Sequence, residues 1–336
     1  MSTIKDVARV AGVSPSTVSR VLSGDGPSAA SEETKKRIWA AVREVNYSVN
    51  EAARELKKKK DYKEMPKVAI DCIIARELDD FFDPLLSAFM HEIEAELFKE
   101  GYRLRCEYGV SSIREHITKN DKKNDAAVIL GRIDKLNLDS VKSHYEHIIY
   151  VGLQDIELDI DSVICRGTEA VRYAMNYLIS LGHRRICYVG ETRNEQRYDE
   201  YIKIIHKDRQ NTLAELTVDV PFTSRGSYDG LCKALEDGMR FTAVLCANDV
   251  SAVGVLRALK EHGLSVPRDV SLVAINDVEN VRYLEPMITT VAIPTQEIGK
   301  HVARILVDRM KHKHMLPVRL YIPSHLCVRD SCMYIG

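Results

Sequence analysis

The N-terminal part of the chain takes its fold from residues 4–22, IKDVARVAGVSPSTVSRVL. The first half of this stretch has apolar residues at helical spacing: Ile4, Val7, Ala8 and Ala11. Gly12 predicts the end of that helix, because glycine takes a left-handed backbone at little cost, and Ser14 can cap a second helix with Pro15 in its first turn. Two short helices joined by a glycine turn are typical of a helix-turn-helix, whose second helix lies in a DNA major groove. An ordinary helical hairpin with a solvated polar face is the alternative.

A third helix is predicted to begin at Ser31, in SEETKKRIWAAVREVNY (31–47). Acidic residues fall in its first turn, where the helix dipole favours them. Its residues expected to close a small three-helix core are Ile38, Ala41, Val42, Val45 and Tyr47.

A short basic segment, NEAARELKKKK (50–60), follows. Asn50 can cap a helix here, but so short a helix is unstable in isolation, so a solvated charged linker remains open. The other interpretation is a hinge that orders only on DNA. In that case Leu56 would enter a minor-groove base step and the lysines would neutralise phosphates.

Charge is divided unevenly along the 336 residues, although the formal net charge is only −1. Residues 1–63 carry 13 basic and 8 acidic residues, a balance of +5, and the remainder carries −6. A basic head on an acidic body suits a protein that touches a polyanion with one end only. The length predicts two or three folded units.

The eight cysteines are scattered, without C-x-x-C or histidine at metal-ligand spacing, so no metal site and no cofactor are expected. The chain begins MSTIKD, without an apolar leader, and contains no run of 18 apolar residues. We therefore expect a cytoplasmic protein with reduced thiols.

From Met65 onward, strand patterns alternate with helix patterns. The predicted strands are 66–74, 102–106, 126–130, 147–151, 185–189, 243–246 and 270–275, and the predicted helices are 84–100, 167–181 and 249–262. This alternation indicates parallel sheets with helices on both faces, which bind ligands beyond the carboxyl ends of their strands. The predicted strand-end loops carry Asp83, Arg197, Asn248, Asp249, Asn276 and Asp277.

These segments together resemble the lactose/galactose-repressor (LacI/GalR) family of bacterial transcription factors. The resemblance rests on IKDVARVAGVSPSTVSRVLSG, ETKKRIWAAVREVNY and NEAARELK, and in the body on LISLGHRRICYVG, FTAVLCANDVSAVGVLRALKEHGLSVPRDVSLVAINDV and PMITTVAIPTQEIG. The segments FFDPLLSAFMHEIE, INDVENVRYLEPMITTV and LPVRLYIPSHLCVR look most like the branch that regulates galactoside utilisation, including the evolved β-galactosidase repressor type.

The resemblance implies an all-α helix-turn-helix headpiece (1–48), a hinge helix and linker (49–64), and an α/β core (65–336). The core would be periplasmic-binding-protein-like, with two doubly wound parallel-sheet subdomains crossed by three strands. Subdomain one would be about 66–163 plus 293–320, and subdomain two about 164–292 plus 321–336. Such proteins are homodimers, each headpiece reading half of a near-palindromic operator. The chain lacks a long heptad tail of the kind that makes some relatives tetramers.

By the same resemblance, the DNA-reading positions are Pro15, Ser16 and Arg20. Arg20 can donate two bonds to a guanine edge, whereas Pro15 offers only apolar contact. The residues implied to hold phosphates are Thr3, Thr17, Ser19 and Ser23. The residues implied for the hinge are Asn50, Ala53, Leu56 and Lys57.

The effector residues that the resemblance implies are Asp83, Arg197, Tyr201, Phe222, Asn248, Asp249, Asn276 and Asp277. Arg197 would donate to sugar hydroxyls and Phe222 would stack on a sugar face. Glu200 replaces the glycine of the family's R-x-x-G-aromatic loop, Asn276 stands where many sugar-binding members have an acid, and Arg166 replaces a common aspartate. These departures leave the identity of the ligand open.

The sequence thus predicts a repressor of a carbohydrate (galactoside) operon, released from its operator by a sugar inducer and nucleoid-associated when bound. A catabolite-control type regulator that needs a corepressor is one alternative, and a soluble sugar-binding protein or transporter component is another. An enzyme is disfavoured, since G-x-S-x-G, Walker, G-x-G-x-x-G and zinc motifs are missing from the sequence.

Overall fold

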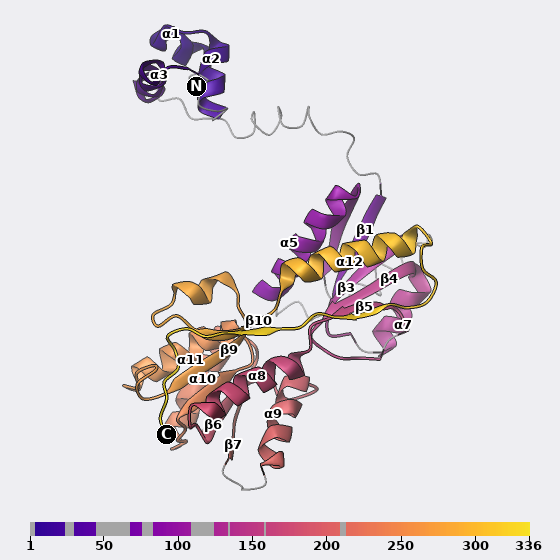
Figure 1. Cartoon of the computed structure of the whole chain (residues 1–336), viewed down its shortest axis with the longest axis vertical. Helices are drawn as coiled ribbons and strands as arrows, with labels where there is room; N and C mark the ends of the chain where they lie inside the picture. Colours follow the sequence, from indigo (N-terminus) through magenta and orange to yellow (C-terminus); the bar gives the residue numbers. More distant parts are fainter. Residues whose placement is uncertain are drawn as a thin grey trace. The chain divides into compact units, whose positions relative to one another are not determined.

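The computed structural model describes residues 4–23, 30–44, 68–75, 83–108, 124–133, 135–157, 159–208 and 213–336. The chain divides into two compact units, Met1–Met65 and Pro66–Gly336 (Figure 1). Among the predicted DNA contacts, those outside the described residues are Thr3, Asn50, Ala53, Leu56 and Lys57. Val45 and Tyr47 of the predicted headpiece core also lie outside them.

The first unit contains the three predicted helices, α1 (Ile4–Ala11), α2 (Pro15–Ser23) and α3 (Glu32–Glu44). Gly12 ends α1 with a backbone φ of +65°, as predicted. Ser14 Oγ accepts a hydrogen bond from the Thr17 amide at 3.2 Å, which caps α2. Ser31 Oγ accepts from the Thr34 amide at 3.3 Å and caps α3 in the same way.

One small apolar core holds these helices together, because α1 packs against both α2 and α3. Its buried members are Val7, Ala8, Ala11, Val18, Val21, Ile38 and Ala41. A core of this size gives a domain only marginal stability.

The second unit begins with a sheet whose strands are all parallel, in the order β11-β5-β4-β3-β1-β2. Its strands are β1 (Val68–Ala75), β2 (Tyr102–Tyr108), β3 (Asn124–Gly131), β4 (Tyr145–Gly152), β5 (Asp161–Ile164) and β11 (Arg319–Tyr321). The helices packed on it are α5 (Pro84–Lys99), α7 (Lys135–His144) and α12 (Thr295–Met310). We call this layer subdomain one (Figure 1).

Subdomain two is built on a second sheet, in the order β12-β10-β9-β8-β6-β7, in which β12 is antiparallel to β10. Its strands are β6 (Arg185–Gly190), β7 (Ala214–Asp219), β8 (Ala243–Cys246), β9 (Ser271–Asn276), β10 (Thr289–Ala292) and β12 (His325–Cys327). Its helices are α8 (Gly167–Ser180), α9 (Gln196–Lys207), α10 (Ser224–Glu236), α11 (Asp249–Glu261) and the 3-10 turn η2 (Glu279–Tyr283).

The chain passes between the two sheets after β5, after β10 and after β11. The predicted fold class, a helix-turn-helix unit with a two-subdomain α/β core, is confirmed. Elements of the second unit that the sequence pattern did not predict are α7, β5, α9, β7, α10, η2, β10, α12, β11 and β12. None of the helices in the described part has the length and apolar character needed to cross a bilayer.

Candidate functional site

The outward face of α2 carries the residues predicted to read DNA. Pro15, Ser16 and Arg20 are exposed, whereas Val18 is fully buried against the other two helices. The Ser14 hydroxyl lies 2.7 Å from that of Ser16 and 2.8 Å from that of Thr17. These bonds orient the start of α2. Farther along the same helix, Arg20 is its long cationic side chain and can reach a base edge.

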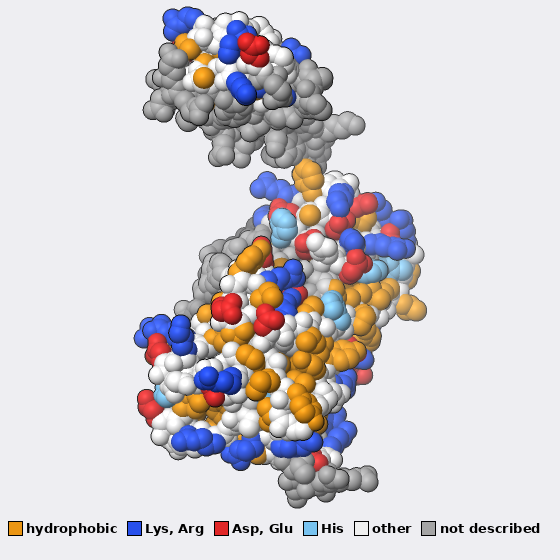
Figure 2. All heavy atoms as spheres, turned by 60° about the vertical axis from the view of Figure 1, so that its left-hand side comes forward, with side chains coloured by type: hydrophobic (Ala, Val, Ile, Leu, Met, Phe, Trp, Pro, Cys, Tyr) orange, Lys and Arg blue, Asp and Glu red, His pale blue; other side chains and the backbone are white. Residues whose placement is uncertain are grey.

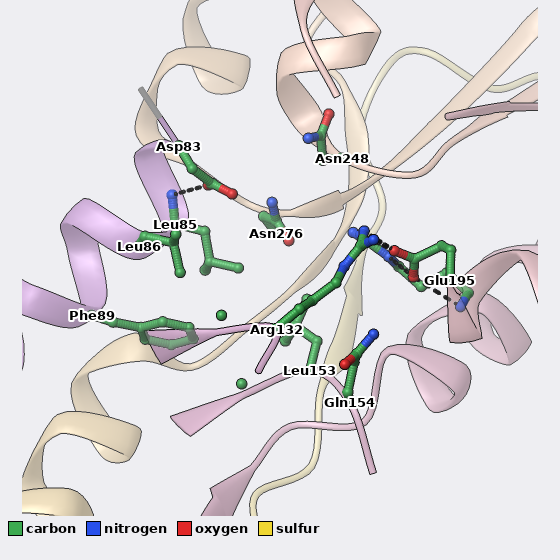
Figure 3. A pocket seen from close by; sticks show the side chains of 13 residues that line it. Asp83, Leu85, Leu86, Phe89, Arg132, Leu153, Gln154, Glu195, Asn248 and Asn276 are labelled. Carbon is green, nitrogen blue, oxygen red and sulfur yellow. Dashed lines mark hydrogen bonds and ion pairs between the residues drawn. The ribbon is translucent and has the colours of Figure 1, made fainter. Parts of the chain in front are cut away.

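A cavity of about 50 Å³ lies in the second unit, and its lining includes residues at the carboxyl ends of strands from both sheets (Figure 3 shows it from close by). Its lining residues are Asp83, Leu85, Leu86, Phe89, Gly131, Arg132, Gly152, Leu153, Gln154, Glu195, Arg197, Asn248 and Asn276. Both subdomains therefore contribute to it, as expected for a binding cleft of an α/β fold.

Arg197 stands in the first turn of α9 and is nearly buried at 6% exposure. Its Nε and Nη2 donate to the two carboxylate oxygens of Glu195 at 2.7 and 2.9 Å, and its Nη1 donates to the Ala247 carbonyl at 2.6 Å. Burial alone would raise the pKa of Glu195, but Arg197 and Arg132 lower that pKa to about 2. Both partners are therefore charged at neutral pH.

Arg132, which directly follows β3, reaches across the cleft from subdomain one. Its guanidinium pairs with Glu191 at 2.9 Å and also with Glu195. The guanidiniums of Arg132 and Arg197 lie 5.2 and 4.5 Å from the ring centre of Phe222. Phe222 thus packs beneath the two cations, in a cation–π arrangement, and does not line the cavity itself.

The other walls combine amides with apolar side chains (Figure 3). Asn248 caps α11 by accepting from the Ser251 amide at 2.8 Å. Asn276 has a positive φ of 126°, and its buried Oδ1 finds no hydrogen-bond partner among the described residues. Asp83 caps α5 through the Leu85 amide at 2.9 Å. The cavity therefore offers a spare amide oxygen beside an apolar wall, which suits a ligand that carries hydroxyl donors.

Four predicted effector residues line the cavity: Asp83, Arg197, Asn248 and Asn276. The prediction for Tyr201 needs correction, because this residue lies on α9 rather than in a loop and is fully buried. Its hydroxyl lies 2.9 Å from both the Ile186 and the Leu216 carbonyl oxygens, to which it can donate its one hydrogen, and it accepts from the Leu216 amide at 3.1 Å, so it ties α9 to the sheet.

Asp249 and Asp277 also stand away from the cavity. Asp249 is buried and accepts from the Thr290 hydroxyl at 2.8 Å and the Val278 amide at 2.7 Å, and burial raises its pKa to about 7. Asp277 forms ion pairs with Arg282 and Arg329 at 2.7 and 2.6 Å. Their contacts hold together the loops that follow β9. Neither residue lines this cavity, and their contacts with a ligand stay a prediction.

Three polar residues of the cavity were missed by the sequence analysis: Arg132, Gln154 and Glu195. Each lies within five residues of a glycine that ends a strand, namely Gly131, Gly152 and Gly190. That spacing is visible in the sequence and could have identified them. Arg166, noted there as a departure, joins the subdomains through Asp155 at 2.8 Å and stacks on Tyr321. Among the described residues no cluster of His, Cys, Asp or Glu could hold a metal ion.

Comparison with known proteins identifies both units. Residues 3–50 match the family "Bacterial regulatory proteins, lacI family", and residues 175–332 match a periplasmic binding protein-like domain. The HTH-type transcriptional repressor PurR of Escherichia coli O139:H28 is 30% identical over 342 residues, covering 98% of this chain and 97% of that protein. The HTH-type transcriptional repressor MelR of Bacillus subtilis (strain 168) is 28% identical over 342 residues, covering 99% and 98%.

Solved structures agree on the fold. The complex of the transcriptional regulator CelR with cellobiose has a TM-score of 0.68 at 24% identity, covering 98% of this chain and 100% of that chain. The lac repressor dimer bound to operator and the anti-inducer ONPF also gives 0.68, at 21% identity and 99% coverage of both chains. The curated relatives are repressors rather than enzymes. With a repressor 30% identical over nearly its whole length, the chain belongs to the lacI family of bacterial transcriptional regulators.

Proposed function

We propose that this repressor responds to an uncharged sugar that binds in the cleft between its subdomains. The observation that carries the proposal is the cavity lining, where both arginines are already paired with carboxylates and the Asn276 Oδ1 has no hydrogen-bond partner among the described residues. The same lining includes the apolar side chains of Leu85, Leu86 and Phe89. Sugars offer hydroxyl donors for such an acceptor and an apolar ring face for such a wall. The cellobiose complex of CelR supports the ligand class.

As the finer identity of the ligand we propose a galactoside, and as the target a near-palindromic operator of a galactoside-utilisation operon. The support is the likeness of three sequence segments to the galactoside branch of the family. A catabolite-control type regulator with a corepressor remains the second candidate, and the sign of the effector's action on operator affinity distinguishes the two. Because its operator lies on bacterial DNA, we place the protein in the cytoplasm, on the nucleoid when bound.

We further propose that the chain acts as a homodimer, so that two headpieces read the two operator halves. Hydrophobic side chains gather on the face of the second unit that Figure 2 turns to the viewer. In subdomain two, Val253 on α11, Tyr283 in η2 and Met287 are exposed large apolar residues. Apolar area of this kind commonly marks a protein–protein contact, and a second copy of the chain supplies the matching surface.

In this mechanism the outward face of α2 reads bases and Leu56 of the hinge enters a minor-groove base step, while the sugar changes how the two subdomains close. Since the described cavity is far smaller than the roughly 300 Å³ of a typical small ligand site, the subdomains must move apart for a sugar to enter. That movement is the step that we couple to operator release, and the coupling is reciprocal between sugar and DNA.

The test titrates operator DNA by fluorescence anisotropy with and without galactose, melibiose, lactose and cellobiose. We expect one of these neutral sugars to weaken operator binding by about 5- to 150-fold, the usual range of allosteric coupling. Tightened binding would favour the corepressor alternative. If none of them changes operator affinity or raises the melting temperature of the protein, the sugar response is refuted.

A further inference from the structure

The cleft contains a carboxylate held between two guanidiniums. Glu195 is only 3% exposed, and each of its oxygens accepts from Arg197, at 2.7 and 2.9 Å. The Arg197 backbone amide donates to the same carboxylate at 3.0 Å, and Arg132 pairs with it from the opposite subdomain (Figure 3). This two-pronged geometry is the one with which arginine holds the carboxylate or phosphate of a bound ligand.

Among the described residues that line the cavity, each positive group has a counter-ion. Arg132 and Arg197 face Glu195 and Glu191, and Asp83 adds a further negative charge at the lining. An anionic ligand would have to displace Glu195 from both arginines, and a buried carboxylate left unpaired is strongly unfavourable. Anions are therefore disfavoured in the cleft even though two arginines stand in it.

We infer that Glu195 determines the charge selectivity of the cleft. It is an internal anion that occupies a two-arginine site, so the cleft admits uncharged ligands and refuses phosphorylated or carboxylated ones. This inference rests on the proposed function, because it names the class of ligand that the same cleft accepts.

The hydrogen-bonding capacity that remains is consistent with an uncharged, hydroxyl-bearing ligand. Within the described residues, Arg197 uses three of its five N–H groups on Glu195 and Ala247, which leaves two for a ligand oxygen. The Asn276 Oδ1, also in the cavity lining, can accept from a ligand hydroxyl. A fully ionised phosphate group has no hydrogen to donate to the Asn276 Oδ1. A sugar hydroxyl can donate a hydrogen to that oxygen and can also accept one from Arg197.

The experiment measures the melting temperature of the full-length protein against inorganic phosphate at constant ionic strength. Wild type should show no phosphate response beyond that of the headpiece, which is common to all variants. Glu195→Gln removes the internal anion and keeps the side-chain shape, so it should bind phosphate at least about 10-fold more tightly than wild type. Glu236→Gln, an equal charge change at the exposed end of α10, is the matched control and should behave as wild type.

A second variant keeps the test decisive if Glu195→Gln does not fold. Glu191→Gln leaves Glu195 in place but frees part of the Arg132 guanidinium, so phosphate binding should strengthen by a smaller factor, about 2- to 3-fold. The inference is overturned if wild type is stabilised by phosphate as much as these variants, or if folded variants respond no more than Glu236→Gln. A parallel titration with galactose tests the proposed function separately, since a missing response to the neutral sugar leaves the phosphate comparison intact.

Discussion

Replacing Glu191 by glutamine should loosen the two subdomains at one rim of the cleft. The Arg132 Nη1 lies 2.9 Å from the Glu191 Oε2, and the two side chains are 26% and 28% exposed. This ion pair joins the end of β3 in subdomain one to the end of β6 in subdomain two. Glutamine removes the charge and nearly preserves the shape, so the expected change is electrostatic rather than steric.

The magnitude follows from the distance and the exposure. At 2.9 Å two unit charges attract by about 1.4 kcal/mol in bulk water and by several times more at a protein surface of lower effective dielectric. Desolvation offsets much of this gain, and Arg132 keeps its second partner, Glu195, so we expect a net loss of about 1 kcal/mol. A loss of that size makes the open arrangement about 5-fold more populated.

Amide hydrogen exchange measures that opening directly. The Asp155 amide of subdomain one donates to the Gln196 Oε1 of subdomain two at 2.9 Å, so its protection depends on the subdomains staying together. Mass spectrometry of the peptide containing Asp155 should show about 5-fold faster exchange in Glu191→Gln, and no change for amides inside β3. Glu236→Gln is again the control. An Asp155 amide that exchanges at the wild-type rate in Glu191→Gln would refute the idea that this pair holds the cleft.

Three further changes test other parts of the molecule. Arg20→Ala should cost about 1–3 kcal/mol of operator binding and relax base preference at one position in an anisotropy assay, whereas Arg37→Ala on the exposed face of α3 should leave base preference intact. Burial lowers the pKa of His183, so below the unfolded value of about 6.5 the unfolded chain takes up a proton that the folded chain refuses. The melting temperature should fall as pH drops below that value, and His183→Gln should flatten the fall, while an unchanged slope would contradict this assignment. Gly254→Ala would place its Cβ 2.0 Å from the Ser224 carbonyl oxygen, where α10 meets α11, so thermal unfolding should show a loss of about 1–3 kcal/mol; a gain would mean that helix propensity outweighs this contact.

The headpiece could be predicted from local signals, because each helix boundary depends on residues only a few positions away. Gly12 and the caps at Ser14 and Ser31 do in the structure what their residue types favour. Most of the longer core strands, such as 126–130 and 243–246, were predicted from their apolar runs, whereas the short strands β5, β10, β11 and β12 were not predicted. By contrast, α9 and α10 are mixed polar segments whose helical state depends on packing against their sheet. A short window of sequence does not predict that packing, because the sheet residues lie elsewhere in the chain.

The site was only partly predictable for a related reason. Asn248 and Asn276 were found because they follow buried strands, and both line the cavity. Tyr201 was misplaced because its position four residues after Arg197 puts it one helical turn farther along α9, where it faces the sheet. The role of Glu195 could not be read from its sequence neighbours alone, because one of its two arginine partners, Arg132, lies 63 residues away in the sequence.

The ends of β4 and β6 separate the residues that shape the fold from those that line the cleft. Both strands end in Tyr-Val-Gly, and a Cβ on Gly152 would lie 2.4 Å from the Tyr150 hydroxyl, while one on Gly190 would lie 2.5 Å from the Ala247 Cβ. The backbone must therefore pass close to buried side chains at both strand ends, and only glycine permits this. The side chains that set the charge of the cleft come one to five residues later, after the chain has left that tight passage. A change at Glu195 can thus alter which ligand enters without disturbing the strand ends. A side chain at Gly152 or Gly190 would instead disturb the end of its own strand and the cleft residues that follow it.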